Sequence, residues 1–291
     1  MKYNLFLGCT IPARGRNYEM AVLAVSKKLG LEFNYVEDFA CCGFPIKSVI
    51  QMGTTLMAAR NLALADVNGY DICTLCSACT AVLTECNHEL KRNEKLKNEV
   101  NRNLEIINKK FKGNVKVKHF ARILYEDIGP EVLLTKIKKK LSMFSFASHY
   151  GCHYLKPSGI YDYFDSPEDA KTLDRLVELT GANVIEYKNK YSCCGGAVLA
   201  ADSDTAYAIA REKLENIKKS GADAINLVCP FCSVMYDANQ REIASKFEEE
   251  YDLPVLYYPQ ILGLAMDLNP KELGLQMNIV KTKKLLAKMS D

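Results

Sequence analysis

Two pairs of adjacent cysteines, each followed by glycine, constrain this chain of 291 residues more than any other feature. One cysteine precedes each pair and a C-x2-C motif follows it, with intervals of 31 and 33 residues in the first half and 40 and 34 in the second. The first set is Cys9, Cys41, Cys42, Cys76 and Cys79, and the second set is Cys152, Cys193, Cys194, Cys229 and Cys232. A five-cysteine pattern that occurs twice predicts two homologous halves.

The same repeat separates the two sets from the remaining cysteines. When the C-x2-C motifs are aligned, Cys73 and Cys86 each fall opposite an asparagine. We therefore leave both out of the predicted ligand sets and expect them to be free thiols.

Short runs of β-forming residues alternate with helical periodicity along the chain. We expect strands at residues 3–8, 31–37, 70–75, 115–121, 143–150, 183–188, 223–229 and 253–259. We expect helices at residues 18–29, 54–67, 93–111, 167–180, 202–220 and 233–250. This alternation predicts an α/β fold of two duplicated halves, residues 1–140 and 141–291, each with a short parallel sheet flanked by helices. The segment 130–142 joins them, and we expect its lysines to lie on a solvated helix face.

Each cysteine group follows a predicted strand. Open α/β sheets bind their ligands at the carboxyl ends of the strands, so we expect the sulfur sites there, near the interface of the halves. The glycine after each pair suits a tight turn that brings backbone N–H groups close to a charged cofactor.

Composition and charge exclude several classes of protein. A hydrophobic fraction of 48% is that of a globular protein, and a net charge of +3 does not indicate binding to nucleic acid or to a membrane surface. The longest uncharged run, residues 141–155, is shorter than the roughly 20 apolar residues that cross a membrane. The first nine residues are too few for a signal peptide, so we expect a cytoplasmic protein. In a reducing cytosol, twelve cysteines indicate metal binding or thiol chemistry.

Five thiols in each half, two of them adjacent, are awkward partners for one zinc ion, which takes four ligands at tetrahedral angles. An iron–sulfur cluster offers several metal atoms, and adjacent cysteines can hold neighbouring iron atoms from one turn of the chain. The pattern therefore favours iron–sulfur clusters. A zinc-bound, non-catalytic scaffold or a thiol switch remains the alternative of a different class.

On this arrangement of cysteines, over nearly its whole length, the chain resembles the CCG-domain family of cysteine-rich iron–sulfur proteins, in particular the catalytic subunits of heterodisulfide reductase from methanogenic archaea. The resemblance implies two noncubane [4Fe-4S] clusters, one held by each cysteine set. It also implies reduction of the mixed disulfide of coenzyme M and coenzyme B to the two thiols in the last step of methanogenesis. Other members of the family would make the chain an electron-transfer subunit of a complex that oxidises lactate, glycolate or succinate.

Partner proteins are also implied by the resemblance. The chain has no G-x-G-x-x-G fingerprint and no ferredoxin signature with which to collect electrons itself. The implied partners are an iron–sulfur subunit with cubane clusters, a flavin subunit, and a hydrogenase or formate dehydrogenase that bifurcates electrons.

Several basic residues near the cysteines are candidate site residues. Both coenzymes carry anionic groups, so basic side chains are expected to bind them. His153, next to Cys152, and Lys190, three residues before Cys193, are candidate proton donors, although each could equally be an ordinary hydrogen-bonding residue. The candidate substrate-binding residues are Arg14, Arg16, Lys47 and Lys156.

Overall fold

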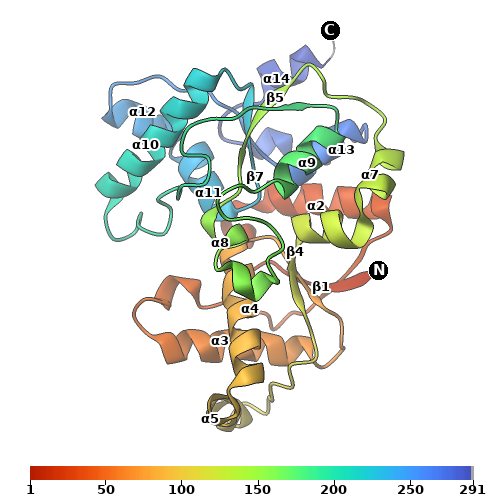
Figure 1. The fold of residues 1–291 in the computed structure, drawn as a ribbon, viewed down its shortest axis with the longest axis vertical. Coiled ribbons are helices and arrows are strands. Elements are labelled where there is room, and N and C mark those ends of the chain that lie inside the picture. Colours follow the sequence, from red (N-terminus) through yellow and green to blue (C-terminus); the bar gives the residue numbers. More distant parts are fainter. Residues whose placement is uncertain (290–291) are drawn as a thin grey trace.

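The computed structural model describes residues 1–289 and contains two four-stranded sheets, one in each half of the chain (Figure 1). All strand pairs are parallel, in the orders β2-β1-β3-β4 and β6-β5-β7-β8. The strands are β1 (Lys2–Phe6), β2 (Glu32–Tyr35), β3 (Ile72–Thr74), β4 (Val117–His119), β5 (Ser145–His149), β6 (Asn183–Val184), β7 (Ala224–Leu227) and β8 (Val255–Tyr257). The predicted duplicated α/β fold is confirmed.

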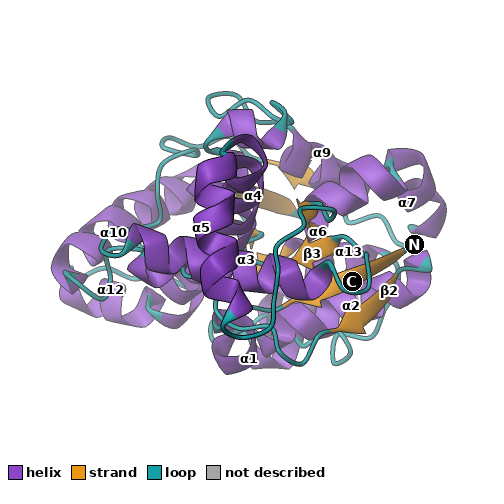
Figure 2. Ribbon diagram, turned by 90° about the horizontal axis from the view of Figure 1, so that it is seen from below, coloured by secondary structure: helices purple, strands orange, loops and turns teal. Residues whose placement is uncertain are grey.

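Helices surround both sheets, so that the strands lie inside the molecule (Figure 2). The helices of the first half are α1 (Thr10–Arg14), α2 (Arg16–Leu29), α3 (Gln51–Ala65), α4 (Ser77–Arg92), α5 (Glu94–Glu105), α6 (Phe120–Arg122), a π-helical turn at Ile123–Ile128, and α7 (Pro130–Lys136). Those of the second half are α8 (Cys152–Leu155), α9 (Thr172–Leu179), α10 (Ser203–Ser220), α11 (Pro230–Ser233), a π-helical turn at Val234–Ala238, α12 (Gln240–Lys246), α13 (Tyr258–Ala265) and α14 (Lys283–Lys288). None of the helices in residues 1–289 is long and apolar enough to cross a membrane.

The strand order creates a crevice at one edge of each sheet. The chain runs from β1 outward to β2 and then crosses to β3 on the other side, and β5, β6 and β7 repeat this path. Connections that leave in opposite directions separate at the carboxyl ends of β1 and β3, which is where open α/β sheets bind ligands. The inner strands β3, β5 and β7 are nearly all buried, whereas the edge strand β2 is partly exposed, which fits a parallel sheet covered on both faces.

The eight predicted strands are all present, but the predicted helices need correction. Helix α4 is absent from the prediction, and ten of its sixteen residues are buried. The predicted helix 93–111 ends at Glu105, and the predicted helix 233–250 is divided by the π-helical turn. In the joining segment, α7 ends at Lys136, and the backbone N–H groups of the next lysines, Lys138 and Lys139, donate to the Ala265 carbonyl. The expected lysine-bearing helix is therefore shorter than predicted.

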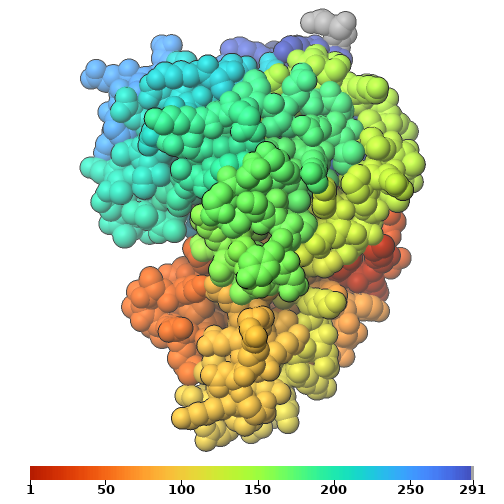
Figure 3. Space-filling view, in the orientation of Figure 1, coloured from red at the N-terminus to blue at the C-terminus, as the bar shows by residue number. Residues whose placement is uncertain are grey.

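The two halves pack through α2 and α13, which lie side by side, and through α4 and α8. In the space-filling view a notch separates the orange surface of the first half from the teal surface of the second (Figure 3). We retain the boundary at residues 140 and 141 as a proposal.

Aromatic residues and a buried histidine fix the interface between the halves. Tyr18 on α2 stacks on Tyr257 at the end of β8, with ring centroids 4.0 Å apart. The carbonyl oxygen of Val228 accepts from the Tyr18 hydroxyl at 3.3 Å and from His119 Nε2 at 3.0 Å. His119 Nδ1 accepts from the Ala121 N–H, so the neutral tautomer with a proton on Nε2 satisfies both contacts. The residue before Cys229 is thus held by the opposite half.

The His119 contact predicts a specific loss of stability in acid. Burial lowers the pKa of His119 from 6.5 to about 4. Between these values the unfolded chain binds more protons than the folded chain, so this contribution is complete above pH 6.5 and is lost as the pH falls toward 4. In His119→Gln, we expect urea unfolding to show a smaller decrease in unfolding free energy between pH 7 and pH 5 than in the parent. The exposed His88 provides the control, since His88→Gln should keep the parental pH dependence. Equal slopes in all three proteins would contradict the assignment.

Candidate functional site

All ten predicted ligands lie where a strand ends or where the next helix begins. Cys9 follows β1 and Cys76 follows β3, on either side of the crevice, and the pair Cys41-Cys42 lies in the loop after β2. The second set occupies the corresponding places after β5, β7 and β6. Parallel strands present their carboxyl ends at the same edge, so this topology brings together thiols that are distant in sequence.

The thiols of the first set form one continuous series of contacts. Cys41 Sγ lies 3.8 Å from Cys9 Sγ and is also hydrogen-bonded to Cys42. Cys42 is hydrogen-bonded to Cys79, and Cys79 to Cys76. The series therefore runs through all five members of the first set.

The second set repeats the series in the equivalent order. Cys152 is hydrogen-bonded to Cys193, and Cys193 to Cys194. Cys194 contacts Cys232, which contacts Cys229. The duplicated cysteine pattern of the sequence is thus also a duplicated arrangement in space.

The two sets meet at the interface of the halves. Across the interface, the thiol of Cys76 in the first set interacts with the thiol of Cys229 in the second, and this interaction raises the pKa of Cys76. These are the first cysteines of the two C-x2-C motifs, and both are buried. Ten thiols from two sheets therefore form a single connected group.

The C-x2-C spacing follows from the helix that begins at each motif. Cys76 is the N-cap of α4 and Cys229 is the N-cap of α11, so each motif places its first sulfur at a helix N-terminus and its second, Cys79 or Cys232, in the first turn. The unpaired N–H groups of a helix N-terminus stabilise negative charge there. Hydrogen bonds lower the pKa of Cys229 (chiefly from Cys232), Cys42 (from Cys41) and Cys193 (from Cys152), so these groups favour thiolates.

Glycine after each pair is required by the backbone. Gly43 has φ of +93° and Gly195 of +80°, in the region that other residues rarely adopt. A Cβ on Gly195 would lie 2.7 Å from the Ala206 carbonyl oxygen in α10, and one on Gly43 would lie 3.0 Å from the backbone of α3. The glycine N–H groups donate to the first sulfur of each pair, to Cys41 at 3.4 Å and to Cys193 at 3.3 Å. The glycine therefore allows close packing on the next helix and supplies a hydrogen bond to a ligand sulfur.

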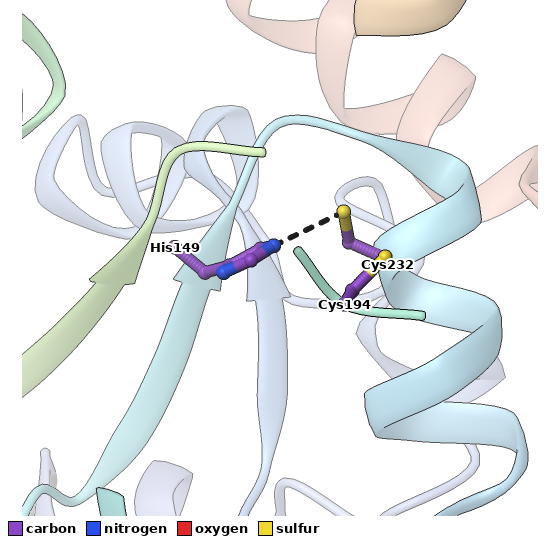
Figure 4. A group of neighbouring side chains, drawn as sticks. All are labelled: His149, Cys194 and Cys232. Atoms are coloured by element: carbon purple, nitrogen blue, oxygen red, sulfur yellow. Dashed lines mark hydrogen bonds between the residues drawn. The ribbon is translucent and has the colours of Figure 1, made fainter. Parts of the chain in front are cut away.

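A histidine that the sequence prediction missed lies against the second set. His149 ends β5 and points its ring toward Cys232, with Nε2 at 3.2 Å from the sulfur and Cys194 beside it (Figure 4). On its other side, Nδ1 is 3.2 Å from the buried amine of Lys213 on α10. The sequence offered one signal for His149, since it occupies the strand-end position where the first half has Phe6.

The amine of Lys213 determines which ring nitrogen of His149 carries the proton. Burial lowers the pKa of Lys213 to about 8, which leaves the amine protonated at neutral pH. A protonated amine has no acceptor, so His149 Nδ1 must accept and Nε2 must carry the proton that faces Cys232. A metal-binding histidine needs a free electron pair on the coordinating nitrogen and donates from the other nitrogen. His149 is therefore a hydrogen-bond donor to the Cys232 sulfur, although His149, Cys194 and Cys232 are close enough to surround an ion.

A small cavity of about 30 Å³ adjoins the second set at the interface. Phe44 and Ser77 contribute to it from the first half, and His153 and Phe231 from the second. The hydroxyl of Ser77 is buried without a hydrogen-bond partner in the described part of the chain. The cavity thus offers aromatic walls, one unsatisfied hydroxyl and the imidazole predicted as a proton donor. Its remaining lining consists of Ala78, Gly151, Cys152, Cys193, Cys194, Ala197, Cys229 and Cys232.

The predicted proton donors lie in different surroundings. His153 lines the cavity and contacts the ring of Phe44 at 4.9 Å between centroids, and its burial lowers its pKa. Lys190 lies outside that lining, with its amine 2.6 Å from Asp174 and 2.7 Å from Glu186. Of the two, only His153 adjoins the cavity.

The predicted substrate-binding residues are spread around the site. Lys47 forms an ion pair with Glu85 and contributes its charge to the surroundings of His153. Arg14 borders a separate cavity of about 320 Å³ next to the C-x2-C motif of the second half. Arg16 and Lys156 are exposed.

The two cysteines left out of the sets are buried elsewhere. Cys73 lies within β3, and Cys86 lies on α4 with its sulfur directed to the Thr55 carbonyl at 3.5 Å. Burial raises the pKa of both thiols, to about 12 for Cys86. Neither thiol belongs to the two series of interacting sulfurs, since only burial and nearby carboxylates shift their pKa values.

This fold and these sites define a duplicated α/β protein with a thiolate-rich centre in each half. A family model described as the cysteine-rich CCG domain matches residues 3–84 and again residues 146–237. The chain belongs to this CCG cysteine-rich domain family.

Similar proteins extend the comparison to the full chain. The chain is 35% identical to one component of the ferredoxin:CoB-CoM heterodisulfide reductase of Methanosarcina mazei, over 99% of this chain and 97% of that protein. It is 29% identical to the 8-methylmenaquinol:fumarate reductase membrane anchor subunit of Wolinella succinogenes, over 98% and 99%. These relatives support a redox role within a multisubunit reductase.

A solved structure of a hypothetical protein from Helicobacter pylori has the same fold, with a TM-score of 0.79 and 16% identity. The match covers 96% of this chain and 52% of that one, so this chain spans about half of the structure's length.

The glycine geometry makes a prediction about stability. Gly195→Ala should destabilise the chain by about 2–5 kcal/mol, since left-handed backbone costs about 1–2 kcal/mol and overpacking a further 1–3. Gly221→Ala is the matched control, because Gly221 also has a positive φ, +76°, but has no atom within 4 Å of the added Cβ. It should lose only the backbone part. Urea unfolding of both variants measures the difference, and equal losses would show that the contact with α10 is unimportant.

Proposed function

We propose that each cysteine set holds one noncubane [4Fe-4S] cluster and that the chain reduces the coenzyme M–coenzyme B disulfide as the last step of methanogenesis. The observation that carries the proposal is the pair of equivalent five-sulfur sets joined through Cys76 and Cys229. The relative in Methanosarcina mazei bears a name that refers to the CoB-CoM heterodisulfide.

The donor atoms of each set fit a cluster better than a single ion. The five thiols of each set interact in a continuous series, and N–H groups donate to sulfurs at Gly43, Gly195 and Gly196. Hydrogen bonds lower the pKa of one thiol of the first set, Cys42, and of two thiols of the second, Cys193 and Cys229. His149 donates a hydrogen bond to Cys232 rather than ligating, so it does not supply the nitrogen ligand of a mixed cysteine–histidine zinc site. When bound, the clusters would supply one-electron transfer and iron that binds sulfur.

The proposed reaction breaks one bond and forms two. The disulfide RS–SR′ takes up two electrons and two protons and yields RSH and R′SH. A partner must supply both electrons, and we propose the iron–sulfur and flavin subunits, with a hydrogenase or formate dehydrogenase, for that role. The aromatic rings of Phe44 and Phe231 pack against each other, 5.7 Å between centroids, and exclude water beside the second set.

His153 is our proposed proton donor, because it lines the cavity next to Cys152. Lys190 is a less direct alternative, since its amine is already paired with two carboxylates. Lys47 is the proposed anion-binding residue nearest to the cavity, with Arg14, Arg16 and Lys156 available toward the surface.

One observation favours a second candidate function within the same family. The relative in Wolinella succinogenes covers nearly the whole chain, and its printed name refers to a menaquinol:fumarate reductase. The chain would then transfer electrons between a membrane partner and a dehydrogenase in a complex acting on lactate, glycolate or succinate. Reduction of the coenzyme disulfide by the isolated chain with an artificial electron donor separates the two functions, since an electron-transfer subunit would show none.

Metal analysis tests the cofactor proposal. Anaerobically purified protein should contain about eight iron atoms and a similar amount of acid-labile sulfide per chain. Cys42→Ala and Cys194→Ala should each halve both values by removing one centre. Cys73→Ala and Cys86→Ala are the matched controls and should keep the parental content. Zinc with little iron would overturn the proposal in favour of the scaffold.

A variant at His153 tests the proton donor. His153→Gln keeps a hydrogen-bonding side chain but cannot exchange a proton, so turnover should fall about 10²-fold or more. His88→Gln, the same change at an exposed histidine outside the cavity lining, is the control and should retain turnover within a few-fold. Iron content must stay at the parental value in both variants. Unchanged turnover in His153→Gln would remove the residue from the mechanism.

A further inference from the structure

The two halves hold their cysteine pairs in the same way but with different charge. In the first half, Asn61 on α3 donates from Nδ2 to the carbonyl oxygens of Ala40 and Cys41, at 3.3 and 3.2 Å. In the second half, Lys213 on α10 donates from Nζ to the carbonyls of Ser192 and Lys190, at 2.6 and 3.1 Å. Both side chains reach the residue just before the cysteine pair, so a cation replaces a neutral amide at the equivalent place.

A second difference lies at the ends of the inner strands. Phe6 ends β1 and packs against Phe39, with ring centroids 5.1 Å apart. His149 occupies the equivalent place at the end of β5 and donates to Cys232. The second set therefore has a polar connection from Lys213 through His149 to the Cys232 sulfur, where the first half has the apolar ring of Phe6.

The cation of Lys213 and the hydrogen bond from His149 both stabilise negative charge at the second cysteine set. Hydrogen bonds to ligand sulfurs and local net charge are among the factors that set the reduction potential of an iron–sulfur centre. A buried cation interacts more strongly with added charge than an exposed one, because water screens it less. Lys213 is 1% exposed and His149 is equally buried, so both contributions favour the reduced form.

We propose that Lys213 and His149 give the centre of the second cysteine set a higher reduction potential than that of the first. The proposal rests on the proposed function in needing a metal cluster in each half. An electron that enters the chain then resides preferentially in the second half, next to the cavity lined by His153 and Phe231. Lys213 and His149 are positioning residues in this role, since neither is a ligand.

The residues at the equivalent positions of the first half suggest the variant that tests this proposal. The double variant His149→Phe/Lys213→Asn gives the second half the residues of the first. EPR redox titration of the anaerobically purified, full-length protein measures both midpoint potentials, and the variants Cys9→Ser and Cys152→Ser assign each signal to its half. The parent should show the second centre at the higher potential. The double variant should shift the electron distribution at least tenfold toward the first centre, which corresponds to about 59 mV for one electron.

Three further variants serve as controls for this titration. Lys219→Asn removes an exposed lysine from the same helix and should leave both potentials unchanged. Lys213→Gln removes the charge and keeps a donor for the carbonyls, and should give most of the shift if the double variant does not fold. Lys213→Arg keeps the charge and should retain most of the parental difference.

The possible outcomes separate the two proposals. A parent with the first centre at the higher potential, or potentials unmoved by the double variant and Lys213→Gln at full iron content, would overturn the inference and leave the proposed function intact. A parent without iron and sulfide would overturn the proposed function and, with it, the inference.

Discussion

The contact between Cys76 and Cys229 is the constraint on which the rest of the architecture depends. Each cysteine begins a helix at the carboxyl end of an inner strand, so the contact requires the carboxyl ends of two separate sheets to face each other. Hydrogen bonds across the interface hold the two sheets in this orientation. Tyr18 and His119 from the first half both donate to the carbonyl of Val228, one residue before Cys229. The packing of the halves therefore sets the separation of the two sulfur sets, and a change at the interface alters the site without touching a ligand.

Glycine and the helix N-termini together explain why so many thiols converge in a small volume. Five acidic groups in contact repel one another when ionised, and they persist only where donors compensate the charge. Backbone N–H groups provide this compensation at Gly43, Gly195 and Gly196, and the N-termini of α4 and α11 add the helix dipole, independently of side-chain chemistry. The same device occurs in both halves, which is why the cysteine spacing survives duplication while most other residues differ.

The sequence predicted the fold, and which cysteines lie together, better than it predicted the surroundings of those cysteines. Strand positions followed from apolar β-forming runs, and duplication made the parallel sheets a strong expectation. Helix α4 escaped prediction because it is buried on most sides, and β6 is reduced to two residues at an edge, where pairing needs little length. The sequence did not indicate a role for Lys213. A lysine in an amphipathic helix gives the same pattern whether its amine faces solvent or, as here, three buried partners. Its role depends on contacts with the loop that α10 packs against, and hydrophobic periodicity does not predict such tertiary contacts.

Duplication also bears on how two similar centres could share a two-electron reaction. Two identical centres in contact would divide an electron equally, and neither side of the substrate would be preferred. Asn61 and Lys213 each donate from N–H groups to backbone carbonyls of the loop that carries a cysteine pair. Exchanging one for the other therefore changes the charge near the pair while the hydrogen bonds to the loop are kept. The cavity breaks the symmetry in the same direction, because His153, Phe231 and five second-set cysteines line it against Phe44, Ser77 and Ala78 from the first half. The cation and the cavity lie on the same side of the Cys76–Cys229 contact, so an electron drawn toward Lys213 is also drawn toward the place where a substrate sulfur would need it.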